Sequence, residues 1–262
     1  MSVVDLMELR ALKRFSNSVG VIEEGERFFA SDEYGKELIG IGIAQLESSQ
    51  QQIAFGQGLR FVVMASGPSL TLEDIQTVWS WRNEGATDRR VVVVNTTFRR
   101  APWADFLYAA DLRWWDEYAQ EAKSTFAGEL WSQHEVARQK YGTRHIQIAR
   151  RPGLSRIKGI IHNGGNSGYQ AIGLATQLGA SSIVLLGFDM YRTNGKSHHH
   201  GDHPKGLKQH SPYEAWLRNF PQLASDLVEA GVMVLNASRA TRLNCFPRAN
   251  LEDALWHQNA SV

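Results

Sequence analysis

The chain has 262 residues, of which 43% are hydrophobic, and this length suffices for one full α/β domain and a small additional module. Its 28 Lys and Arg residues against 27 Asp and Glu leave a net charge of +1, which argues against nucleic-acid binding through overall charge. A single cysteine excludes an internal disulfide, and no run approaches the roughly 18 apolar residues of a membrane helix. Because the N-terminus also lacks the apolar core of a signal peptide, the sequence predicts a protein of the cytoplasm without a membrane span.

The first 57 residues predict a small β-rich module. Strands are expected at 8–15, 26–30 and 43–46, with a short helix after Ser31. The stretch 47–58 is rich in Ser, Gln and Gly and is expected to form a linker. Such a module is too short for a large core of its own, so we expect it to serve in docking or as an adaptor.

From residue 58 to residue 262, apolar runs alternate with helical patterns and no hairpin signal intervenes. Strands are expected at 60–65, 91–94, 105–110, 182–186 and 232–235, with weaker candidates at 130–131 and 145–149. Helices are expected after Leu70 and at 112–122, 168–178, 212–229 and 251–256. Alternating strands and helices predict an α/β fold, a doubly wound, mainly parallel Rossmann-like sheet.

The helix after Leu70 has its own start signal. Thr71 and Asp74 have the spacing of a capping box, and Ile75, Val78 and Trp79 supply its apolar positions. Further along, the pair Trp114 and Trp115 is expected in the core.

Polar or glycine-rich turns follow the predicted strands. Ser66-Gly67-Pro68-Ser69 follows the first strand, Asn95 the second and Asp111 the third, and Asp189-Met190-Tyr191 comes after the strand at 182–186. The turn Gly164-Gly165-Asn166-Ser167-Gly168 leads into a helix N-terminus, where backbone N–H groups form an anion site. Because parallel sheets bind ligands outside the carboxyl ends of their strands, these turns predict one crevice. For the Ser-Gly-Pro-Ser sequence, a turn with a capping serine is an equal alternative.

Charge is distributed unevenly. Residues 136–188 contain no acidic side chain but seven basic ones: Arg138, Lys140, Arg144, Arg150, Arg151, Arg156 and Lys158. This basicity suits a phosphorylated ligand, and a solvated basic face is the equal alternative.

The segment 192–211 is longer than a connection requires and contains five histidines and an aspartate, His198, His199, His200, Asp202, His203 and His210. Histidine exchanges protons near neutral pH, so the segment could supply a general base or acid. Histidines with Asp202 could instead bind a transition metal, although their spacing does not match a structural zinc site. We take His203 as the catalytic candidate beside Asp202, with a solvated loop as the alternative, and for His199, His200 and His210 we prefer the solvated loop.

An ordered set of these motifs resembles known families. Ala65–Leu70, Asn95, Ser167–Tyr169, Leu178–Ala180 and Gly187–Tyr191 together are similar to the bacterial sialyltransferases of glycosyltransferase family 42. They also resemble domain of unknown function 115, which includes archaeal 6-hydroxymethylpterin diphosphokinase. The resemblance covers about residues 59–248. With Ala101–Asp105 and Gly201–Pro204 included, the whole pattern is most similar to a set of phage and prophage proteins. The N-terminal module, with Gly25–Phe28 and Lys36–Ile39, resembles small modules encoded among phage head genes.

The resemblance to sialyltransferases implies that Gly67, Ser69, Asn95 and Ser167 hold a nucleotide-sugar and that Tyr191 assists the leaving phosphate. It also implies a catalytic histidine at the end of a Ser-His-x-x-Gly-His stretch, which points to His203, although Asp202 intervenes here. Those enzymes need no metal, so no tightly bound cofactor is expected. The resemblance to the diphosphokinases implies ATP and magnesium instead, with Asp189 and Asp111 facing the metal.

Three functions are therefore open. The first is a nucleotide-dependent transferase that moves a sugar from a nucleotide-sugar, with backbone amides of Gly67 and Gly168 and a cation of the basic segment stabilising the leaving phosphate. The second is a phage head- or virion-associated accessory protein without turnover, docked through residues 1–57, in the host cytoplasm or the virion. The third is a Mg-ATP pyrophosphokinase. The predicted nucleotide-binding residues are Ser66, Gly67, Pro68, Ser69, Asn95, Asp111, Gly165, Asn166, Ser167, Gly168 and Asp189, and the predicted catalytic residues are His203, Asp202 and Tyr191.

Overall fold

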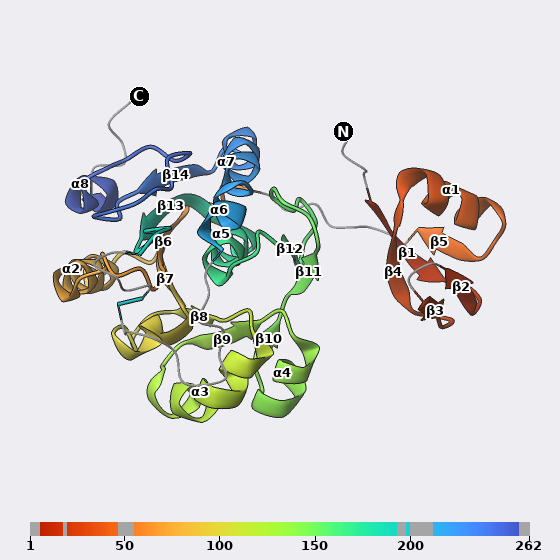
Figure 1. The fold of residues 1–262 in the computed structure, drawn as a ribbon, viewed down its shortest axis with the longest axis horizontal. Coiled ribbons are helices and arrows are strands. Elements are labelled where there is room, and N and C mark those ends of the chain that lie inside the picture. The colour runs from red at the N-terminus through yellow and green to blue at the C-terminus, as the bar shows by residue number, and fades with distance from the viewer. Residues whose placement is uncertain (1–5, 18–19, 47–54, 193–197, 200–211, 257–262) are drawn as a thin grey trace. The chain divides into compact units, whose positions relative to one another are not determined.

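The computed structural model describes residues 6–17, 20–46, 55–192, 198–199 and 212–256 (Figure 1). These residues fall into two compact units, one within Met1–Gln52 and one within Ile53–Val262. No helix among the described residues is both long and apolar enough to cross a membrane.

The N-terminal unit is a three-stranded antiparallel sheet with one helix and one hairpin. The sheet order is β4-β1-β5, and β2 pairs with β3. The elements are β1 (Leu6–Ala11), β2 (Phe15–Asn17), β3 (Gly20–Ile22), β4 (Arg27–Ser31), α1 (Asp32–Gly40) and β5 (Ala44–Leu46). Leu9, Phe28 and Leu38 are buried in its small core. The first strand is shorter than predicted, because the chain turns after Ala11 into a hairpin that the sequence analysis missed.

The C-terminal unit contains a seven-stranded, fully parallel sheet, which confirms the predicted fold class. Its order is β10-β9-β8-β7-β6-β13-β14. The strands are β6 (Leu59–Met64), β7 (Arg89–Val94), β8 (Phe106–Tyr108), β9 (Glu129–Ser132), β10 (Arg144–His145), β13 (Ala180–Leu186) and β14 (Met233–Asn236). A separate parallel pair consists of β11 (Gln147–Ala149) and β12 (Ile160–His162).

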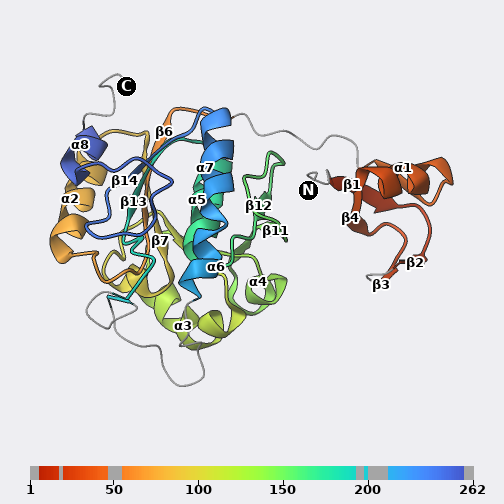
Figure 2. The same ribbon diagram turned by 45° about the horizontal axis from the view of Figure 1, so that its top comes forward.

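Helices cover both faces of this sheet. Side chains of a strand alternate between its two faces. Phe61 and Val63 of β6 therefore pack in the cluster of α5 and α7, whereas Val62 and Met64 pack in the cluster of α2, α3 and α8. Figure 2 shows α5 beside α7 and, across the sheet, α2 beside α8. The helices are α2 (Leu72–Asn83), η1 (Asn95–Arg99), α3 (Leu112–Thr125), α4 (Glu135–Tyr141), α5 (Ser167–Gln177), α6 (Tyr213–Leu217), α7 (Phe220–Glu229) and α8 (Leu251–Trp256).

Two helices differ from the sequence-based expectation. In α2 the capping box of Thr71 and Asp74 is present, but Trp79 is 43% exposed and Trp81 is the buried tryptophan. The core face of α2 is set by where the helix meets the sheet and α8, which periodicity alone does not give. The single helix expected at 212–229 is two helices, α6 and α7. The break precedes Pro221, which has no N–H to donate and lies in the first turn of α7.

The order of the sheet reverses between β6 and β13. Strands β7 to β10 follow β6 on one side, and β13 and β14 lie on its other side. Such a switch point leaves a crevice at the carboxyl ends of the two strands, where open α/β sheets bind their ligands.

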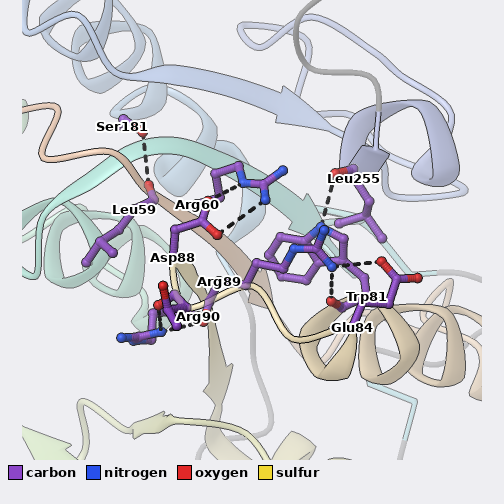
Figure 3. A network of polar contacts seen from close by, with 10 residues as sticks. Leu59, Arg60, Trp81, Glu84, Asp88, Arg89, Arg90, Ser181 and Leu255 are labelled. Atoms are coloured by element: carbon purple, nitrogen blue, oxygen red, sulfur yellow. Dashed lines mark hydrogen bonds and ion pairs between the residues drawn. The ribbon is translucent and has the colours of Figure 1, made fainter.

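The opposite, amino-terminal end of these strands is closed by a polar network (Figure 3). Arg60, at the start of β6, donates to both carboxylate oxygens of Asp88 at 2.7 and 3.4 Å. Arg89 donates to the backbone carbonyl of Trp81 and pairs with Glu84 at 2.9 Å, while its guanidinium lies 5.2 Å from the centre of the Trp81 ring. Arg60 and Arg89 are thus paired with carboxylates, and Arg89 ties the start of β7 to the end of α2.

Candidate functional site

A pocket lies at the switch point, at the carboxyl ends of β6, β7 and β13. Its empty space is about 510 Å³, part of which is open to solvent. The lining residues are Ala65, Ser66, Gly67, Val94, Asn95, Asn166, Ser167, Gly168, Gly187, Asp189, Met190, Tyr191, His198, Tyr213 and Trp216. Segments about 150 residues apart in the sequence therefore meet at one crevice.

The N-terminus of α5 contributes hydrogen-bond donors to the pocket. Asn166 caps the helix, because its Oδ1 accepts the N–H of Tyr169 at 2.9 Å. The N–H groups of Ser167 and Gly168, in the first turn, have no acceptor among the described residues. The Nδ2 of Asn166 is likewise buried without a hydrogen-bond partner in the described part of the chain. Three donors at the positive end of a helix dipole form an arrangement suited to an anion.

The hydroxyl of Ser167 has a structural partner. Its Oγ accepts the N–H of Ala110 at 3.2 Å, which ties α5 to the end of β8. Nearby, the buried side chain of Gln170 accepts from the hydroxyl of Tyr108 at 2.8 Å and donates to Asn163 at 3.1 Å. Asn163 in turn accepts the N–H of Gly165 at 2.8 Å. These bonds fix the backbone of the glycine turn before α5 and so set the direction of its donors.

The turn after β6 is held closed from within. Asp189, which is 2% exposed, accepts the N–H of Ser69 at 2.9 Å and the Ser69 hydroxyl at 2.6 Å. The N–H of Gly67 donates to the carbonyl of Gly187 at 2.9 Å. The expected role of the Gly67 amide as a phosphate donor is therefore wrong, because that amide bonds the protein itself. Glycine is required there because a Cβ would collide with Asp189 and with the Gly187 carbonyl.

Two residues of the pocket have a strained backbone. Asn95 has φ 51° and Met190 has φ 57°, and no other non-glycine residue among those described has positive φ. Asparagine tolerates this region, whereas for methionine it costs about 1 kcal/mol or more. Strain of this kind concentrates at functional sites, and both residues line the same pocket.

The described part of the histidine segment contacts the turn after β6. The Nδ1 of His198 lies 3.0 Å from the Ser66 hydroxyl, and the N–H of His199 donates to the Ser66 carbonyl at 2.9 Å. The Nε2 of His199 lies 3.2 Å from the Thr97 hydroxyl, and Arg100 donates to the His199 carbonyl at 3.3 Å. His198 thus lines the pocket, although the sequence analysis did not select it. Both predicted catalytic residues of this segment, Asp202 and His203, lie outside the described residues.

Aromatic side chains form one wall of the pocket. Tyr213 and Trp216 come from α6 and pack edge to face, with ring centres 5.5 Å apart. The Tyr213 hydroxyl is buried and has no hydrogen-bond partner among the described residues. Neither residue stands out in the sequence as a site residue, because a spacing of three along a helix is also that of core side chains.

Some predicted site residues do not reach the pocket. Pro68, Ser69, Asp111 and Gly165 are not among the lining residues, and Asp111 precedes α3 as its N-cap. The seven cations of the basic segment are absent from the lining as well. Four of them instead pair with carboxylates elsewhere: Arg138 with Glu135, Lys140 with Asp116, Arg144 with Glu129, and Arg156 with Glu229. These four cations are thus engaged outside the described pocket lining, and a contribution of this segment to phosphate binding stays a prediction.

The electrostatics of the pocket follow from these contacts. Its described lining contains no Lys or Arg, and its one acidic side chain, Asp189, has both carboxylate oxygens hydrogen-bonded by Ser69. Among the described residues no cluster of His, Cys, Asp or Glu has the arrangement of a metal site. Within the described lining, the positive end of the α5 dipole is therefore the feature that favours an anion.

Comparisons with family models, with curated proteins and with solved structures found no match for this chain.

Proposed function

We propose that the protein is a nucleotide-dependent transferase that moves a glycosyl group from a nucleotide-sugar to a hydroxyl acceptor. The observation that supports this most is the set of donors at the start of α5, two backbone N–H groups and the Nδ2 of Asn166. They belong to residues that line the pocket at the switch point, and they have no partners among the described residues. A phosphate group of the donor substrate satisfies all three, as at other helix N-termini.

The chemistry assigns roles to the remaining lining residues. The acceptor hydroxyl oxygen forms a bond to the anomeric carbon as the bond from that carbon to the phosphate oxygen breaks. The proton of the acceptor passes to a histidine of the segment 192–211, and the resemblance indicates His203. His198 is the histidine of this segment that lines the pocket among the described residues. The leaving phosphate takes the bonding electrons, and the donors of α5 together with the Tyr191 hydroxyl stabilise its charge. Asn95 and Ser66, which line the pocket, hold hydroxyl groups of the substrate in this proposal.

A substitution that keeps the helix cap tests this proposal. In Asn166→Asp the carboxylate still accepts the N–H of Tyr169, since Asp and Asn are equivalent N-caps. The substitution replaces the Nδ2 donor of Asn166 by a negative charge, which repels a phosphate. We therefore expect the affinity for nucleoside monophosphates and diphosphates to fall at least about tenfold. Asn250→Asp is the matched control, because Asn250 accepts the N–H of Glu252 at the start of α8, away from the pocket.

The assay is a thermal-shift panel of CMP, UDP, GDP, ADP and ATP, with and without magnesium, followed by titration of the best ligand. We expect a nucleotide to stabilise the wild type and the Asn250→Asp variant, and this stabilisation to be lost in the Asn166→Asp variant. A response that requires magnesium would favour pyrophosphoryl transfer. No response to any nucleotide, together with co-purification of phage head protein, would favour an accessory role without turnover.

A further inference from the structure

We propose that α6 forms the seat of the nucleobase, with the base stacked against Trp216 and its polar edge hydrogen-bonded to the hydroxyl of Tyr213. This inference rests on the proposed function and assigns the two ends of the bound nucleotide: phosphate at the N-terminus of α5 and base at α6.

Trp216 lies next to the glycine turn that precedes α5. A Cβ on Gly165 would lie 3.0 Å from Cδ1 and 3.4 Å from Nε1 of the Trp216 indole, so the indole lies against the backbone of the glycine turn. Asn219 donates from Nδ2 to the carbonyl of Gly164 at 3.0 Å and ties the junction of α6 and α7 to the same turn. The aromatic wall and the donors of α5 are therefore held together as one unit, at neighbouring positions along the pocket.

Helix α6 is only partly buried. None of its residues is fully buried, and Tyr213 and Trp216 only partly cover the core cluster below α5 and α7. Aromatic side chains that pack only in the core are fully buried, as Trp115 and Phe220 are in this unit. Two half-buried rings that line a pocket instead offer a flat apolar surface to a planar group.

The hydroxyl of Tyr213 lacks a hydrogen-bond partner among the described residues. It is buried, and a buried polar group without a partner costs free energy. A ligand with a polar ring edge provides that partner. A sugar-phosphate alone accepts hydrogen bonds from the donors of α5 but leaves the Tyr213 hydroxyl without a partner. The chemical class that meets both requirements, a flat face and a polar edge, is a nucleobase.

The test compares ligands with and without a base. The probes are CMP, UMP, AMP and GMP, with ribose 5-phosphate as the base-free probe, titrated into wild type, Trp216→Ala, Trp216→Phe and Tyr213→Phe. Trp79→Ala is the matched control, because Trp79 is partly exposed on α2 and is not in the pocket lining. Urea unfolding of each variant verifies that it is folded.

We expect Trp216→Ala to weaken the best-bound nucleotide roughly 5- to 150-fold and to leave ribose 5-phosphate unchanged. Trp216→Phe should retain most of the affinity, and Tyr213→Phe should lose about fivefold. Equal affinity of wild type for the nucleotides and for ribose 5-phosphate would overturn the base seat while leaving the phosphate site standing. An equal loss of both ligand types in Trp216→Ala would also overturn it, because the indole would then act only through the glycine turn. Wild type that binds none of the probes would overturn the proposed function and this inference with it.

Discussion

Replacing Gly67 by alanine probes the closed turn beside the pocket. The new Cβ would lie 2.7 Å from Cγ of Asp189 and closer still to its Oδ1 and to the carbonyl oxygen of Gly187. To restore van der Waals contact, both groups must move by about 1 Å. That movement stretches the bond from the Gly67 N–H to Gly187 and the two bonds from Ser69 to Asp189.

The expected cost follows from these contacts. Overpacking costs about 1–3 kcal/mol, and a weakened hydrogen bond to a buried carboxylate costs about 1.5–3 kcal/mol. We therefore expect Gly67→Ala to lower the free energy of unfolding by about 3–5 kcal/mol.

Urea unfolding followed by tryptophan fluorescence measures this change, since all eight tryptophans belong to the C-terminal unit. Gly173→Ala is the control, because its Cβ would lie 3.4 Å from Ile161, at ordinary contact distance, within α5. We expect that variant to be neutral or stabilised by up to about 1 kcal/mol. If Gly67→Ala unfolds at the urea concentration of the wild type, the turn is not held by Asp189 as described.

Two further predictions concern stability. Burial, and next the charge of Arg151, lower the pKa of His162 to about 4. Because an unfolded histidine titrates near pH 6.5, the protein should lose about 2–3 kcal/mol of stability as the pH falls from about 6.5 to 4, and His162→Gln should reduce that loss in urea titrations across this range. Trp81→Phe removes the bond from Nε1 to the carbonyl of Leu255 (3.0 Å) and should lower the midpoint of urea unfolding by the equivalent of about 1–3 kcal/mol. Trp79→Phe, at an exposed position, should stay within about 0.5 kcal/mol of the wild type, and equal effects of the two tryptophan variants would contradict the buried role of Trp81.

Local sequence signals predicted most of the fold. The run Val91–Val94 is apolar on both faces, as a central parallel strand must be, and β7 extends over it. The capping box before α2 and the glycine turn before α5 fixed two helix starts to within a residue. Since parallel strands carry their carboxyl ends at one edge, the meeting of Ser66, Asn95 and Asp189 at one pocket was also predictable.

Contacts between distant segments were not predictable in this way. The uninterrupted basicity of residues 136–188 suggested a cation for the pocket, yet Arg156 pairs with Glu229 and Arg144 with Glu129. Asp189 looked like a ligand-facing or metal-facing carboxylate, and the structure shows it bonded to Ser69. Charge and residue type are properties of the sequence, but the partner of a charged group depends on which surfaces the fold brings together.

By itself, the sequence determined where most strands and helices form and which turns lie at the carboxyl edge of the sheet. Hydrophobic periodicity, glycine positions and capping residues act over a few neighbouring residues, and these signals are complete in the sequence. The tertiary structure alone decided that the donors of Asn166 and Gly168 have no partner among the described residues, whereas the amide of Gly67 donates to Gly187, and that Trp216 lines one side of the pocket. These outcomes depend on packing between segments far apart in the chain, where a shift of about 1 Å decides whether a hydrogen bond forms.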